Sequence, residues 1–258
     1  MRKRAKHKQA MKKIRIPLMM LLLVGAIACN KNSGLQTDIT ANVSESDAAD
    51  MVGASLSVNS NGLASISNDV TIKSKWFIDN HLTCGATKTD TLTKTSQPGA
   101  PVTFSYGLGY SYTLNCNASN IPDNITGKVN FSGSHSGPHF SSSNTGNLIF
   151  RVAGLTPTAP NYVLNATFIQ SGSFISKKDT TNHGNENLSV VVQNLKFNKP
   201  VPTIAGGTAT FTLTGTVPKK GAFSYSGTLV FNTDGTAKLT VNGSVFIINL
   251  LTGEKSKG

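Results

Sequence analysis

The sequence predicts an all-β domain in which an antiparallel meander forms a strongly curved sheet or a partly open barrel; a β-sandwich is the alternative. Three observations lead to this prediction. Apolar and polar residues alternate over long stretches, which is typical of strands with one buried face. Near the C-terminus such stretches are separated by Asp234-Gly235 and Asn242-Gly243, which are strong hairpin signals. From about residue 70 onward no helical stretch alternates with the strands, which excludes parallel βαβ units.

The clearest strand is the stretch VTFSYGLGYSYTLNC, residues 102–116. Its even positions carry apolar side chains or Cys, and its odd positions carry Ser, Thr, Gly or Asn. These residues would span about 50 Å at about 3.3 Å each, which is long for a globular strand. We expect one long strand that is apolar on one face and bends where Gly107 and Gly109 lie on the other.

The rest of the chain also reads as strands. The C-terminal part, 207–251, is expected to form a meander of four strands, and further strands are expected upstream at 125–133, 146–153, 160–171 and 186–198. In the last of these the apolar phase shifts between Val192 and Leu195, which indicates a β-bulge.

Only one short helix is expected, in the stretch SESDAADMVGASLS at the start of the domain. Ser44 or Ser46 is placed to cap it, and acidic residues follow in its first turn. Gly53 weakens the helix. Four apolar residues fall on one face: Ala48, Met51, Val52 and Leu56.

The N-terminal residues predict an export signal rather than a membrane-spanning helix. The first 15 residues hold eight Lys or Arg and no acidic residue, and an apolar stretch of 13 residues, 16–28, follows. At about 1.5 Å per residue this stretch reaches about 20 Å, less than the roughly 30 Å of a hydrocarbon core. A basic start, a short apolar stretch and small residues before a cleavage site are typical of signal peptides. Met11 offers a second start from which the signal is still complete.

The residues Ala26-Ile27-Ala28-Cys29 resemble the lipobox of bacterial lipoproteins. The resemblance implies that the Cys29 thiol receives a diacylglyceryl group, that the signal is cleaved before it, and that the new amino group is acylated. The commonest lipobox has Leu where Ala26 stands and Ala or Ser where Ile27 stands, and an ordinary signal peptide is the alternative. Two or more acyl chains would anchor the protein stably to a membrane, which one chain would not.

We therefore expect a signal peptide at 1–28, a polar tether at 29–45 and a single antiparallel β domain at 46–258. The pattern of the mature chain resembles uncharacterised lipoproteins of Bacteroidota, through YTLNCN, SGPHFSSSNTGN and GTLVFNTDGTAKLTVNGSVFIINLLTGE. This resemblance implies no known activity. In that phylum acidic residues after the lipidated Cys favour surface display, and residues 30–33 contain none. We expect an outer-membrane protein that faces the periplasm, with surface display as the alternative.

The charge of the chain does not point to a nucleic-acid partner. The formal net charge is +12, but residues 1–28 hold eight of the 24 basic residues and none of the 12 acidic ones. The chain from Cys29 keeps 16 basic and 12 acidic residues, a net charge of +4, which is a weak signal for nucleic-acid binding.

Beyond Cys29 the chain has two cysteines, Cys84 and Cys116. Disulfides persist in the compartments to which exported proteins go, so we expect these two residues to form one. A metal site made of His81, Cys84 and Cys116 is the alternative. It lacks a second close pair of ligands.

No motif for a phosphate-binding loop, a zinc helix or a nucleophile turn is present in the sequence. His135, His139 and His183 lie in polar stretches and are weak metal-ligand candidates, with exposed loop histidines as the alternative. Tyr106, Tyr110 and Tyr112 are expected either in the core or along a groove that binds an apolar ligand. Each tyrosine suits both settings.

We expect a non-enzymatic protein without a cofactor, which has a binding or structural role at the bacterial envelope. A periplasmic carrier of a lipid or other apolar ligand is the alternative. An apolar ligand and an envelope protein are the partners expected besides the membrane.

Overall fold

The computed structural model describes residues 43–258, which belong to one compact unit. Eleven strands form one antiparallel sheet in which every strand lies next to its neighbours in the chain. The sheet does not close: β1 and β11 are its two edges. The strands are β1 (Thr87–Thr95), β2 (Thr103–Cys116), β3 (Pro122–Ser136), β4 (Phe140–Ala153), β5 (Asn161–Ser176), β6 (His183–Asn198), β7 (Ile204–Val217), β8 (Gly221–Phe231), β9 (Thr236–Val241), β10 (Ser244–Asn249) and β11 (Lys255–Lys257).

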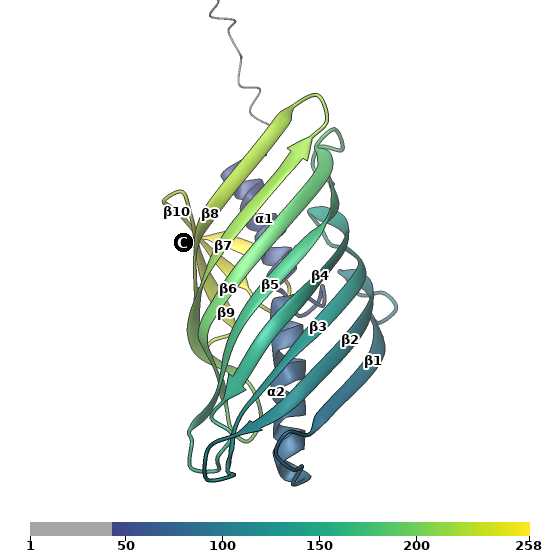
Figure 1. Ribbon diagram of the computed structural model, residues 1–258. Coiled ribbons are helices and arrows are strands. Elements are labelled where there is room, and N and C mark those ends of the chain that lie inside the picture. The colour runs from purple at the N-terminus through teal and green to yellow at the C-terminus, as the bar shows by residue number, and fades with distance from the viewer. Residues whose placement is uncertain (1–42) are drawn as a thin grey trace, which may run out of the picture. The chain divides into compact units, whose positions relative to one another are not determined.

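The sheet curls around two helices, α1 (Glu45–Leu56) and α2 (Leu63–Asp79), which lie on its concave face (Figure 1). Apolar side chains of both helices and of the concave face make up one hydrophobic core. The fold class is therefore the predicted one, an all-β antiparallel meander in the form of a curved, open sheet. Neither helix in the described part of the chain is long and apolar enough to cross a membrane.

The prediction of a single short helix is wrong, because α2 is a second and longer one. The residues of α2 that reach the core include Leu63, Ile66, Val70 and Phe77, and their spacing follows helical periodicity. The stretch is also rich in β-branched residues, and Gly62 before it provides no side-chain cap. Packing inside the curved sheet stabilises the helix despite this weak intrinsic propensity.

The expected helix is present as α1, capped by Ser44 and Asp47 in a reciprocal capping box. It is buried on nearly all sides rather than on one face only. Gly53 allows its close contact with the C-terminal turn, since a Cβ at Gly53 would lie 2.5 Å from the carbonyl oxygen of Gly253.

The predicted bulge and hairpins are confirmed. The register of β6 on β7 shifts between Gln193 and Lys196, and Asn194 has a φ of 52°, so Val192 and Leu195 both face the core. The β8–β9 and β9–β10 hairpins turn at the predicted positions, with positive φ at Gly235 and at Asn242-Gly243.

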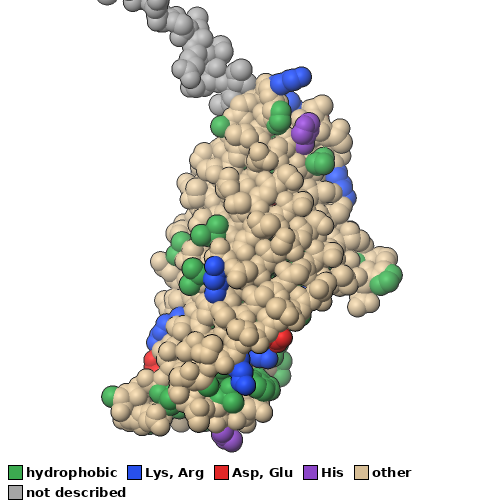
Figure 2. Space-filling model, turned by 45° about the vertical axis from the view of Figure 1, so that its right-hand side comes forward, with side chains coloured by type: hydrophobic (Ala, Val, Ile, Leu, Met, Phe, Trp, Pro, Cys, Tyr) green, Lys and Arg blue, Asp and Glu red, His purple; other side chains and the backbone are tan. Residues whose placement is uncertain are grey.

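The convex face of the sheet is polar. It carries many Ser, Thr and Asn side chains, and few charged side chains are visible on the face shown in Figure 2. Some aliphatic side chains are exposed among them, such as Ile149 on β4 and Ile169 on β5.

Candidate functional site

The structure joins Cys84 and Cys116 in a disulfide, with a Cα–Cα distance of 5.7 Å. The predicted pairing is therefore confirmed. The bond connects the loop between α2 and β1 to the end of β2. Cys29, the signal peptide and residues 29–42 of the tether lie outside the described residues.

The tyrosine stripe of β2 lies in the core, under α2, and does not line an open groove. Tyr106, Tyr110 and Tyr112 are each at most 4% exposed. The ring centroid of Phe77 on α2 is 5.9 Å from that of Tyr112, and the Tyr110 hydroxyl donates a hydrogen bond of 2.8 Å to Asp69. Of the two settings expected for these tyrosines, the structure shows the core.

The three candidate histidines do not form one cluster. His135 is buried on the concave face of β3, His139 is exposed in the β3–β4 turn, and His183 begins β6. The β3–β4 turn, which holds His139, does contact the β5–β6 turn, which leads to His183. The Lys177 backbone amide donates a hydrogen bond of 2.7 Å to the His139 carbonyl oxygen. Within residues 43–258 no three His, Cys, Asp or Glu side chains converge in a way that could hold a metal ion.

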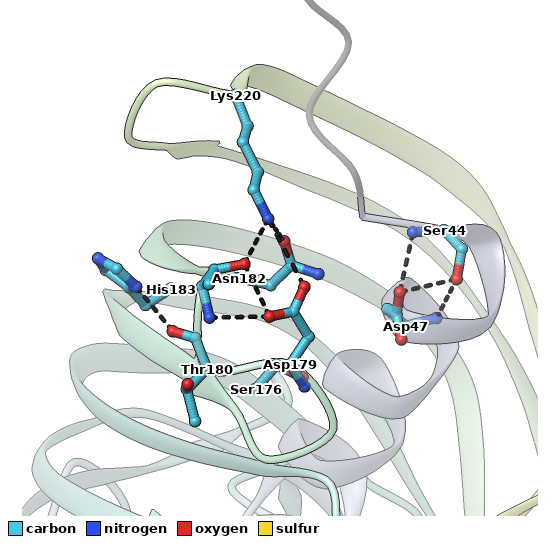
Figure 3. Close-up of polar contacts among 9 residues, drawn as sticks. Ser44, Asp47, Ser176, Asp179, Thr180, Asn182, His183 and Lys220 are labelled. Atoms are coloured by element: carbon cyan, nitrogen blue, oxygen red, sulfur yellow. Dashed lines mark hydrogen bonds and ion pairs between the residues drawn. The ribbon is translucent and has the colours of Figure 1, made fainter.

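The β5–β6 turn, which leads to His183, is held by other polar contacts. The His183 ring lies 2.9 Å from the Thr180 carbonyl oxygen, and Lys220 reaches across from the β7–β8 turn (Figure 3). Its ammonium group donates to Asn182 and lies 3.6 Å from Asp179. These contacts tie two neighbouring hairpins together at their tips.

A buried polar network, which the sequence analysis did not identify, crosses the concave face from β2 to β6. Glu186 accepts hydrogen bonds from Ser142 at 2.8 Å and from Gln170 at 3.3 Å. Gln170 also donates to Ser55 of α1. The glutamate is 4% exposed, so the network fixes a carboxyl group inside an otherwise apolar core.

The network continues from Ser142 to a buried histidine. The Asn144 amide donates to Ser142 at 3.1 Å, and the Tyr106 hydroxyl donates to Asn144 at 3.0 Å. The Tyr106 oxygen lies 3.3 Å from Nδ1 of His135. The sequence places these side chains on inward-facing strand positions, but only the sheet register shows that they meet.

Burial shifts both titratable ends of the network toward their neutral forms. It raises the pKa of Glu186 from 4.5 to about 7, against the hydrogen bonds from Ser142 and Gln170. It lowers the pKa of His135 from 6.5 to about 4. Each shift corresponds to roughly 3 kcal/mol between the two protonation states.

These two groups predict opposite pH dependences of stability. The contribution of Glu186 to the free energy of unfolding is fully present below pH 4.5 and is lost as the pH rises through 7. That of His135 is present above pH 6.5 and is lost as the pH falls through 4. In the wild type the two slopes largely cancel between pH 4.5 and 6.5.

We expect the stability of the Glu186→Gln variant to show the pH dependence of His135 alone. Its free energy of unfolding should rise by roughly 3 kcal/mol more than that of the wild type between pH 4 and 7. Urea unfolding of both proteins across this range, with a chelator present, measures the difference. Parallel curves for the two proteins would mean that Glu186 does not titrate as a buried group.

One surface cleft of the described residues lies beside the edge strand β1, and we call it the seam cleft. It has a volume of about 520 Å³. Its walls come from the connection between α1 and α2, the start of α2, β1, the β6–β7 connection, the β8–β9 turn and the turn after β10. The lining residues used below are Val58, Asp69, Lys94 and Leu251.

One ion pair lies in the seam cleft. The Lys94 ammonium group is 2.5 Å from Oδ2 of Asp69, which also accepts the Tyr110 hydroxyl. A second depression of about 310 Å³ shares Val58 and Lys94 with the seam cleft and continues along β1. The sequence did not reveal this cleft, because its walls come from six separate segments.

Comparisons with protein-family models, with curated proteins and with solved structures find no match to this chain.

Proposed function

We propose that this chain is a lipid-anchored protein of the bacterial envelope whose β domain binds a ligand in the seam cleft without catalysing a reaction. The proposal places Cys29 in the outer membrane and the domain in the periplasm. The basic and apolar N-terminus, the lipobox-like residues and a disulfide that suits an oxidising compartment support this address.

The seam cleft is the observation that carries the binding role. Its volume of about 520 Å³ falls in the range of pockets that bind small molecules, which are mostly apolar with a few polar groups. Leu251 is 56% exposed and Val58 is 40% exposed at its walls. Since a bound apolar group would cover them, the cleft favours a ligand with an apolar body.

The ion pair in the cleft favours a polar group at one end of that ligand. The Asp69 carboxylate and the Lys94 ammonium group are each about one quarter exposed, so they remain within reach of a bound molecule. The proposed ligand class is therefore amphipathic. This retains the carrier alternative but moves its site from the tyrosine stripe, which α2 covers, to the seam cleft.

Mass spectrometry on the protein from its own host tests the proposal in two steps. The denatured chain should begin at Cys29 and carry acyl chains, and an unmodified Cys29 would contradict the anchor. The chain expressed from residue 30 and exported to the periplasm should then show, under native conditions, an adduct of lipid-like mass. Protein without any adduct is next titrated with a fluorescent fatty acid.

Two matched substitutions localise the binding. Leu251→Lys places a charge in the seam cleft, and Ile149→Lys places one on the convex face, where the side chain is also 56% exposed. We expect Leu251→Lys to weaken fatty-acid binding at least tenfold and Ile149→Lys to change it less than twofold. Equal effects, or no binding by the wild type, would remove the binding role and favour a structural one.

A further inference from the structure

A small cavity lies where α1, the β3–β4 turn and the turn before β11 meet. Its volume is about 30 Å³, which is enough for one ion or one water molecule. Six of its lining residues carry polar side chains that matter here: Asp50, Ser57, Ser60, His135, His139 and Glu254.

Two of these residues bring buried polar atoms that have no partner. Oδ1 of Asp50 and Nε2 of His135 are buried, and neither makes a hydrogen bond in the structure. The two residues are 8% and 6% exposed. Burying a polar atom without a partner is costly, so two such atoms on residues that line one cavity indicate that something binds there.

The direction of the hydrogen bonds assigns the tautomer of His135. The Tyr106 hydroxyl donates its proton to Asn144, so its oxygen can only accept from Nδ1 of His135. Nδ1 therefore carries the ring proton. Nε2 is left with an unshared electron pair, which is the form that binds metal ions.

Asp50 offers a second electron-pair donor. Its Oδ2 forms an ion pair with Lys255, which leaves Oδ1 as a free carboxylate oxygen. Both unpartnered atoms therefore accept, and neither can satisfy the other. Imidazole nitrogen and carboxylate oxygen together are typical ligands of zinc and related divalent ions.

We propose that this cavity binds a divalent transition-metal ion through Nε2 of His135 and Oδ1 of Asp50. As the side chains stand, no three such ligands converge within residues 43–258. His139 and Glu254 line the same cavity from two turns, are exposed, and complete the coordination by rotating inward. The bound ion connects α1, the β3–β4 turn and the C-terminal turn. This site is independent of the proposed function.

Calorimetric titration of the chelator-treated chain, expressed from residue 30, with zinc chloride tests the site. We expect one ion per chain. His139→Ala and Glu254→Gln change exposed side chains that the fold does not need, and each should weaken binding at least tenfold, as should Asp50→Asn. His183→Ala alters another exposed histidine and should leave binding unchanged.

Thermal unfolding provides a second readout. Zinc at 100 times its Kd should raise the Tm of the wild type by roughly 5–10 °C, and that of the His139→Ala variant by less. Absence of stoichiometric binding in the wild type would overturn the proposal and leave the cavity to a water molecule. Binding that none of the three ligand variants weakens would also overturn it, because the ion would then lie elsewhere.

Discussion

Replacing Phe77 by Ala should lower the free energy of unfolding by about 3–5 kcal/mol. Phe77 is fully buried on α2, where its ring packs 5.9 Å from that of Tyr112. Removing the ring leaves a cavity between the helix and the concave face of the sheet. The surrounding strands are held by their ladders and collapse only partly, so most of the lost contact is not recovered.

The neighbouring aromatic residue is the matched control. Trp76 is 40% exposed, and its ring lies 4.8 Å from the Lys73 ammonium group. We expect Trp76→Ala to cost clearly less than Phe77→Ala, because the Trp76 ring is partly in contact with solvent and an exposed cation–π contact contributes only about 0.5–1 kcal/mol. Urea unfolding followed by circular dichroism measures both variants. Similar losses would show that α2 does not insert this face into the sheet.

Removing the disulfide should have the second large effect. The cysteines are 32 residues apart, and the chain-entropy model gives roughly 3–4 kcal/mol for closing a loop of this size in the unfolded chain. The double substitution Cys84→Ser and Cys116→Ser should therefore lower the free energy of unfolding by about this amount. The bond also fixes the loop that leads from α2 into the edge strand β1.

The reduced wild type is the control for the two serines. Its unfolding midpoint in urea should agree with that of the double variant, because both lack only the covalent link. Thiol labelling of the native chain, read by mass, should find neither cysteine free before reduction. Two labelled cysteines in the native protein would contradict the bond, whatever the unfolding curves show.

The sequence alone determined most of the sheet. The alternation in 102–116, the phase shift after Val192 and the turns at Asp234-Gly235 and Asn242-Gly243 are local signals, and local geometry decides them. The pairing of Cys84 with Cys116 followed from counting cysteines in a chain that we expect to be exported. The first helix was also found, because Ser44 and Asp47 cap it within four residues.

The tertiary structure decided α2 and what the sheet encloses. Leu63, Ile66, Val70 and Phe77 have helical spacing, but the β-branched residues between them weaken that signal. The helix is stabilised because its apolar residues pack against the apolar concave face of the curved sheet. The same packing buries the tyrosine stripe, which by its sequence suits either core or groove, in the hydrophobic core.

The candidate sites depended on the tertiary structure for a related reason. The ion pair of the seam cleft joins Asp69 to Lys94 across 25 residues, and the small cavity beside α1 is lined by both Asp50 and His135. Alternation states which face of a strand a residue occupies, but not which distant residue lies opposite. That depends on how strongly the sheet curls and where its edges stop, which is set by the sum of many packing contacts rather than by any short stretch of sequence.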